Sequence, residues 1–157
     1  IKHVAEKTSD LKSKIILEIT AGQGTELGFR LEELAEIYNA IDNKKKVKIC
    51  LDTAHIFGGG YDLRQEKNCL SFIAEAEKLI GLDNVACIHF NDSKKALGSR
   101  VDRHQDIGKG EIGEDGLRAF FAQLNSKVNG VIPFILETPE EFLSYADQIK
   151  MIREWKL

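Results

Sequence analysis

Four short apolar runs, spread along the whole chain, constrain its fold more than any other feature. They span residues 15–19, 47–51, 85–90 and 131–136. Three of them are almost continuously apolar and rich in β-branched residues, which is typical of strands buried on both faces of a parallel sheet. We therefore expect four parallel strands.

Helical patterns separate these runs. Apolar residues recur at helical spacing within residues 31–41, 70–80, 117–124 and 139–152, and residues 1–13 are expected to form a helix before the first strand. Strand followed by helix, four times over, predicts an α/β fold with right-handed crossovers. Such a chain forms either a small open sheet or half of an eight-stranded TIM barrel.

Composition limits the class of protein. A chain of 157 residues with 43% apolar residues is long enough for one domain with a core. It contains no run of about 18 apolar residues and no signal-peptide core at its start. We therefore expect no membrane span and a cytoplasmic location, or nucleus or mitochondria if the source is eukaryotic. The formal charge of −3 does not favour a basic nucleic-acid module.

The cysteines indicate no disulfide framework. Cys50, Cys69 and Cys87 are odd in number and contain no CxxC pair, which also argues against a zinc ribbon. We expect them to be buried as small apolar side chains.

Polar residues that can bind a metal ion close all four apolar runs. The candidate ligands are Glu18, Asp52 with nearby His55, His89, Glu137, and on a later loop Asp102 and His104. In parallel α/β folds the carboxyl ends of the strands form the functional face. A carboxylate or imidazole that ends an apolar strand loses water and needs a partner, and a shared divalent cation supplies one.

The ligand types narrow the metal and the chemistry. Imidazoles and carboxylates, with no cysteine expected nearby, suit zinc, manganese or cobalt. Two metals bridged by a carboxylate clamp the attacking and leaving oxygens of a phosphodiester. The loop after the third run carries Lys94, Lys95, Arg100 and Arg103, which indicates an anionic substrate. Gln23, on the loop after the first run, is a further candidate contact.

The motifs around these residues resemble those of the endonuclease IV family of zinc-dependent apurinic/apyrimidinic endonucleases. The matching stretches, in the family's order, are residues 18–24 (EITAGQG), 51–57 (LDTAHIF), 60–64 (GYDLR), 89–94 (HFNDSK), 98–104 (GSRVDRH), 108–113 (GKGEIG) and 135–138 (ILET). The strings at 51–57 and 98–104 are specific, whereas ILET alone is weak.

This resemblance implies a TIM (β/α)8 barrel that binds three zinc ions, with manganese as an alternative, and cuts DNA on the 5′ side of abasic sites during DNA repair. Glu18 then corresponds to a carboxylate that bridges two zinc ions, and Glu18 and Glu137 to catalytic residues. The second zinc takes Asp52, His89 and Glu137, and the third takes His55, Asp102 and His104. Gln23, Lys94, Arg100 and Arg103 correspond to DNA-binding positions.

One departure from the family is large. The resemblance implies nine ligands, of which two histidines come from a first half-barrel that has no counterpart here. We therefore expect residues 1–157 to form a single domain, the C-terminal half of a TIM barrel with about four βα units. The chain is then a fragment, or a split-gene product that pairs with the missing half, and is inactive or weakly active alone. The full-length protein is expected to act as a monomer on double-stranded DNA.

Two other interpretations remain open. A xylose-isomerase-like sugar isomerase or epimerase would explain Glu18, Asp52, His89 and Glu137. It explains neither the set of His55, Asp102 and His104 nor the basic loop. A non-catalytic remnant that binds metal or DNA is the second alternative.

Overall fold

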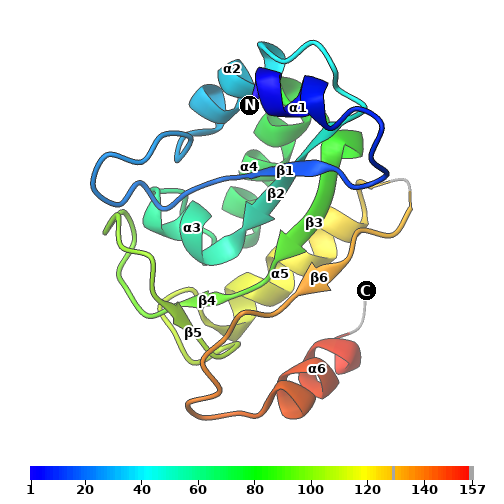
Figure 1. The fold of residues 1–157 in the computed structure, drawn as a ribbon. Helices are drawn as coiled ribbons and strands as arrows, with labels where there is room; N and C mark the ends of the chain where they lie inside the picture. The colour runs from blue at the N-terminus through cyan, green and yellow to red at the C-terminus, as the bar shows by residue number, and fades with distance from the viewer. Residues whose placement is uncertain (129, 156–157) are drawn as a thin grey trace.

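The computed structural model describes residues 1–128 and 130–155 and contains the expected parallel sheet (Figure 1). Its four strands run in the order β1-β2-β3-β6. They are β1 (Ile15–Glu18), β2 (Val47–Asp52), β3 (Val85–His89) and β6 (Phe134–Ile135). All three pairings are parallel, so the carboxyl ends of the strands lie at one edge of the sheet.

The register aligns the strand ends. Glu18 pairs with Cys50, Asp52 pairs with His89, and His89 pairs with Ile135. Residues paired across parallel strands point to the same face, and side chains alternate between faces along each strand. Glu18, Cys50, Asp52 and His89 therefore share one face of the sheet.

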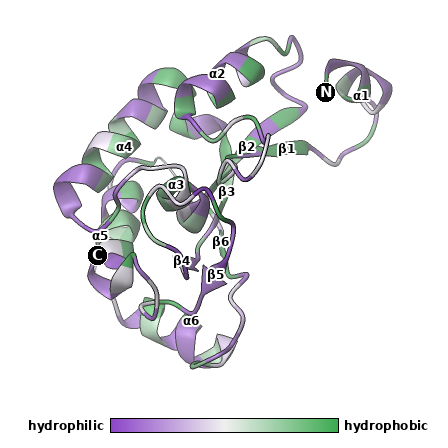
Figure 2. Cartoon of the chain, turned by 90° about the vertical axis from the view of Figure 1, so that its left-hand side faces the viewer, coloured by the Kyte–Doolittle hydropathy of each residue, from purple (hydrophilic) through white to green (hydrophobic). Residues whose placement is uncertain are grey.

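Three helices cover the opposite face. These are α2 (Leu31–Asn39), α4 (Glu66–Leu79) and α5 (Gly113–Asn125), which lie together on one side of the strands in Figure 2. The core between sheet and helices includes Ile49, Leu51, Ile88, Leu34, Phe72, Ile73, Leu117 and Phe120. Burial of these apolar side chains is the main force that holds the layers together.

Short elements complete the fold. They are α1 (Lys2–Lys7), α3 (Thr53–Gly58), a 3-10 turn η1 (Leu82–Asn84), the antiparallel pair β4 (Asp92–Ser93) and β5 (His104–Gln105), and α6 (Tyr145–Glu154). The sequence patterns predicted neither α3 nor the β4–β5 pair. Both follow the carboxyl ends of central strands and therefore shape the candidate site.

Two predicted helix boundaries are wrong. The first helix ends at Lys7 rather than near residue 13, and α6 begins at Tyr145 rather than Pro139. The Asp106 carboxylate accepts hydrogen bonds from the Phe142 and Leu143 backbone N–H groups, which holds this segment as a loop. Glu140 has a φ of 56°, which a helix does not allow.

The last strand is shorter than expected. Of residues 131–136, only Phe134 and Ile135 are assigned to β6, and Val131 is 95% exposed. Pro133 lacks a backbone N–H, although its carbonyl accepts a hydrogen bond from Ile88. In the part of the chain that the structure describes, no helix has the length and apolar character needed to cross a membrane.

Candidate metal centre

The strand ends bring four predicted ligands together. Glu18, Asp52, His89 and Glu137 each offer one ligand atom, and these atoms all lie within 4.8 Å of one another. His89 Nδ1 lies 3.1 Å from Glu18 Oε1 and 3.0 Å from Glu137 Oε2. The parallel register is the cause, because it sets Asp52 beside His89 at the end of the two central strands.

A second group lies beside the first and shares Asp52 with it. Asp52, His55 and His104 also offer ligand atoms within 4.8 Å of one another. The Asp102 Oδ1 atom lies 3.2 Å from His55 Nε2 and 3.3 Å from His104 Nε2. Helix α3 supplies His55, and the β4–β5 segment supplies Asp102 and His104, so the two unpredicted elements build this half of the centre.

Backbone carbonyls orient two of the imidazoles. His55 Nδ1 lies 2.9 Å from the Ile19 carbonyl oxygen, and His104 Nδ1 lies 3.2 Å from that of Glu137. A carbonyl only accepts, so each Nδ1 carries a hydrogen, and in the neutral form of each ring the lone pair is on Nε2. Among the described residues, neither buried Nε2 atom has a hydrogen-bond partner. Two lone pairs that face the Asp102 carboxylate fit a cation between them.

Asp52 is a fully buried carboxylate. It caps α3 by accepting the His55 backbone N–H at 2.9 Å, and its other oxygen accepts from Asn91 Nδ2 at 2.8 Å. Burial nevertheless raises the pKa of Asp52, because it outweighs the nearby His55 and His104, which act to lower that pKa. A carboxylate as buried as Asp52 is stable in its charged form only beside a positive partner, which a divalent cation provides.

The surroundings of His55 favour positive charge. Burial acts to lower the pKa of His55, but the hydrogen bond to Glu18 and the charges of Asp52 and Asp102 outweigh it and raise the pKa to about 10. Burial likewise acts to raise the pKa of Glu18, whereas His55 and His89 together lower it. In the metal-free chain, a proton on His55 therefore offsets the negative charge of the carboxylates around it. A bound metal ion would offset the same negative charge in its place.

Asn91 holds two of the candidate ligands in place, a role that the sequence patterns did not predict. Its side chain donates to Asp52 and accepts from the Glu137 backbone N–H at 2.8 Å, so it joins two ligands on β2 and after β6. Thr53 Oγ1 donates to the Asn91 carbonyl at 2.6 Å and holds the turn in place. A polar residue directly after an apolar strand is the signal that could have identified it.

Asp92 organises the loop behind the centre. Its carboxylate accepts backbone N–H groups from Ser93, Gly110, Ile112 and Gly113. A Cβ at Gly110 would lie 2.3 Å from the Ser93 carbonyl oxygen, so glycine is required there. This contact explains Gly110, and Gly108 and Gly113 on either side of it have positive φ angles of 74° and 79°.

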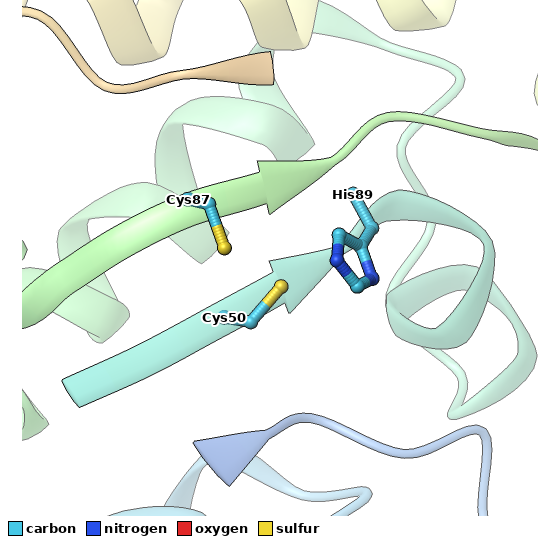
Figure 3. Close-up of side chains that lie close together, drawn as sticks. All are labelled: Cys50, Cys87 and His89. Carbon is cyan, nitrogen blue, oxygen red and sulfur yellow. The ribbon is translucent and has the colours of Figure 1, made fainter. Parts of the chain in front are cut away.

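The expectation that no cysteine lies near the ligands is wrong. All three cysteines are free and buried, as predicted, but Cys50 and Cys87 lie side by side next to His89 (Figure 3). A register shift between Ile49 and Cys50 places Cys50 opposite Cys87. Burial, with the Cys87 thiol and the Glu18 carboxylate, holds the pKa of Cys50 far above its ordinary value.

The four predicted DNA-binding residues lie on the loops around the centre. Gln23 Oε1 accepts the Asp102 backbone N–H at 3.2 Å, and the Arg103 side chain donates to the Asp102 carbonyl. The Arg100 guanidinium lies 4.4 Å from the centroid of the Phe29 ring. Lys94 forms an exposed ion pair with Glu141 at 2.8 Å. All four residues are exposed.

Comparison with known proteins agrees with this fold. Residues 1–155 match the family described as xylose isomerase-like TIM barrel. A probable endonuclease 4 from Methanosphaera stadtmanae is 43% identical over 144 residues, 92% of this chain and 50% of that protein. One from Chloroflexus aurantiacus is 48% identical over 126 residues, 80% of this chain and 43% of that protein.

A solved structure gives the same result. The endonuclease IV from Thermus thermophilus superimposes with a TM-score of 0.75 at 34% identity, over 96% of this chain and 53% of that chain. The chain therefore spans about half the length of the relatives it matches. The resemblance to endonuclease IV is confirmed, and the four-stranded sheet corresponds to part of a barrel. The chain belongs to the xylose isomerase-like TIM barrel family.

Proposed function

We propose that this chain is the metal-binding half of a DNA-repair endonuclease that hydrolyses the phosphodiester on the 5′ side of abasic sites. The observation that carries the proposal is the convergence of seven candidate ligands at the strand ends, where two buried imidazole nitrogens have no hydrogen-bond partner among the described residues. Relatives named probable endonuclease 4, at 43–48% identity, support this choice of activity.

Two zinc positions follow from the two groups of ligands. Glu18, Asp52, His89 and Glu137 would hold one ion, and His55, Asp102 and His104 the other. Imidazole nitrogen and carboxylate oxygen are ordinary zinc ligands, and manganese accepts the same set. Bound zinc supplies Lewis-acid stabilisation of the charge that develops on the reacting phosphate. Glu18, which lies 3.1 Å from His89, would also be shared with a further zinc ion whose two histidine ligands belong to the missing half-barrel.

The protein's own contribution is to fix the ligands before the substrate arrives. Asn91 sets the distance between Asp52 and Glu137. The carbonyls of Ile19 and Glu137 hold the hydrogen of each neutral imidazole on Nδ1, so Nε2 of His55 and of His104 would be the metal-binding atom. Contacts that orient metal ligands in this way typically change metal affinity or activity by about 10- to 100-fold.

The loops around the centre would hold the DNA backbone. Arg100 is exposed beside Phe29, and Gln23 and Arg103 both contact the loop backbone at Asp102. Arginine binds phosphate oxygens through charge and paired hydrogen bonds. Lys94 would first have to leave Glu141, an exposed pair that costs little to break. Because phosphate contacts dominate, binding should weaken steeply with added salt.

A second half-barrel would complete the enzyme. Strands β1 and β6 are both edge strands, and Ile16 and Ile135 on them are 45% and 43% exposed. An open edge of this kind pairs readily with further strands. We infer a monomer once the barrel is complete, acting where DNA is held: the cytoplasm of a prokaryote, or the nucleus or mitochondria of a eukaryote.

Strand incision tests the proposal. The substrate is a duplex with one tetrahydrofuran abasic analogue. It is offered to the chain alone and to the chain joined to the part of the Methanosphaera stadtmanae relative that lies outside the match. We expect zinc-dependent nicking 5′ to the lesion by the joined protein, little by the chain alone, and none after chelation. A folded, zinc-loaded protein that does not nick would contradict the endonuclease. Ketose–aldose interconversion by that protein would support a sugar isomerase instead.

A further inference from the structure

Cys50 and Cys87 lie beside His89, and the proposed endonuclease uses neither thiol. The three side chains offer ligand atoms that lie within 4.8 Å of one another. In Figure 3 the two sulfur atoms point toward each other from neighbouring strands, and the His89 ring lies beyond them at the end of β3. We propose that this group is a second metal site, selective for a soft monovalent cation of the Cu⁺ type.

The sheet builds this geometry. Cys50 and Cys87 are register partners on adjacent parallel strands, so their side chains leave the same face. Cys87 and His89 are two residues apart on β3 and share that face as well. Two sulfurs bound to one ion at about 2.3 Å are roughly 3.8 Å apart, a separation that thiol rotation can reach from the observed arrangement.

The ligand chemistry selects the ion. Thiolates are soft ligands that favour Cu⁺ over hard, oxygen-seeking cations. Cys50 is 1% and Cys87 7% exposed, so both thiols are shielded from bulk water, and with His89 they offer three ligands. Structural zinc sites are almost always four-coordinate, which makes this group a poor zinc site beside the carboxylate and imidazole groups. As each copper–sulfur bond forms, the thiol releases one proton to solvent, and copper stays in its +1 state.

His89 connects the two sites, because it belongs to both the sulfur group and the group of Glu18, Asp52 and Glu137. Its side chain is 18% exposed, which gives an ion a route to the buried sulfurs through the mouth of the centre. Copper in the sulfur site would therefore alter an imidazole that the carboxylate group also needs.

The test is anaerobic titration of the reduced chain with Cu⁺, supplied as its acetonitrile complex against a chromophoric Cu⁺ chelator. We expect one Cu⁺ per chain, with sulfur neighbours in the copper X-ray absorption spectrum. Cys50→Ser and Cys87→Ser should each weaken binding at least ~10-fold, and His89→Gln should do the same while sulfur neighbours remain. Cys69→Ser, which removes the buried cysteine of α4, is the matched control and should bind as the unchanged chain does.

Circular dichroism identifies any variant that fails to fold, and the absorption spectrum of the unchanged chain stands without variants. A copper spectrum with nitrogen and oxygen neighbours alone would overturn the proposal, as would equal binding by Cys50→Ser and the unchanged chain. Neither result bears on incision by the zinc-loaded protein, so the two proposals can fail independently.

Discussion

Buried polar groups at the two ends of the parallel sheet differ in whether they have hydrogen-bond partners. Before the start of β2, Lys46 is 5% exposed, and its ammonium group donates to the Leu11 and Ser13 carbonyls at 2.8 and 2.6 Å. At the carboxyl ends, His55 Nε2 and His104 Nε2 face Asp102 and are buried with no hydrogen-bond partner in the described part of the chain. The buried ammonium group at the first end is hydrogen-bonded and contributes to stability. The buried imidazole nitrogens at the second end lack partners, which is typical of a binding site.

The largest effect we expect is a loss of zinc affinity when Asp52, at the carboxyl end of the sheet, is replaced. Asp52→Asn keeps the shape of the side chain and its hydrogen bond from the His55 backbone, but removes the buried charge shared by both ligand groups. We expect zinc affinity to fall by at least ~100-fold, more than the loss of a residue that only orients a ligand causes. Competition with a zinc indicator measures this. Asp62→Asn, which affects a carboxylate paired with Arg64, serves as control, and an equal loss in both variants would contradict the account.

A second effect is the pH dependence of the metal-free chain. The pKa of His55 is raised to about 10, against an ordinary value near 6.5. The stability that His55 contributes is therefore fully present below pH ~6.5 and is lost as the pH rises through about 10. Urea unfolding with a chelator across this range should show the decline, and His55→Gln should remove it. A decline of equal size in His55→Gln would assign the effect to other groups.

Removal of the Asn91 side chain tests whether a residue that contacts the ligands, but is not itself a ligand, contributes to zinc binding at the carboxyl end of the sheet. Asn91→Ala leaves all seven candidate ligands in place but frees Asp52 and the Glu137 backbone. Zinc affinity should fall about 10- to 100-fold, as measured with the same indicator. Asn39→Ala, at the exposed end of α2, should leave the affinity unchanged. An unaltered affinity in Asn91→Ala would show that the amide does not position the ligands.

The smallest expected effect lies at the other end of the sheet. Lys46→Met keeps the alkyl stem and leaves two carbonyls without their donor, so the free energy of unfolding should fall by about 1–3 kcal/mol. Lys45→Met, at an exposed neighbour, should change it by less than ~0.5 kcal/mol. Zinc affinity should be the same in both. A weaker zinc affinity in Lys46→Met would mean that the two ends are not independent.

The sequence was sufficient to predict the sheet and the candidate ligands because both depend on local patterns. Apolar runs marked the strands, and the residue that closed each run, such as Glu18 or His89, marked the site. Helix α3 was missed because its six residues are held by the Asp52 cap and by packing rather than by a long periodic pattern. The late start of α6 depends on Asp106, which is distant in sequence.

The cysteine pair could not be predicted for a different reason. If the β2–β3 register continued without a shift from the Ile49–Val85 pair, Cys50 would face Ala86. The irregularity after Ile49 places it opposite Cys87 instead. No pattern within either strand records the alignment between them, because pairing depends on how two distant segments pack. Spacing in the sequence therefore gave no sign of two thiols beside the ligands.

Zinc X-ray absorption on the zinc-loaded chain tests the central claim most directly. We expect bound zinc to be surrounded by nitrogen and oxygen atoms at about 2.0–2.2 Å, from the imidazoles and carboxylates at the strand ends. We expect no sulfur neighbours at about 2.3 Å, because Cys50 and Cys87 do not belong to the zinc groups. A folded chain that binds no zinc, or zinc coordinated mainly by sulfur, would contradict it.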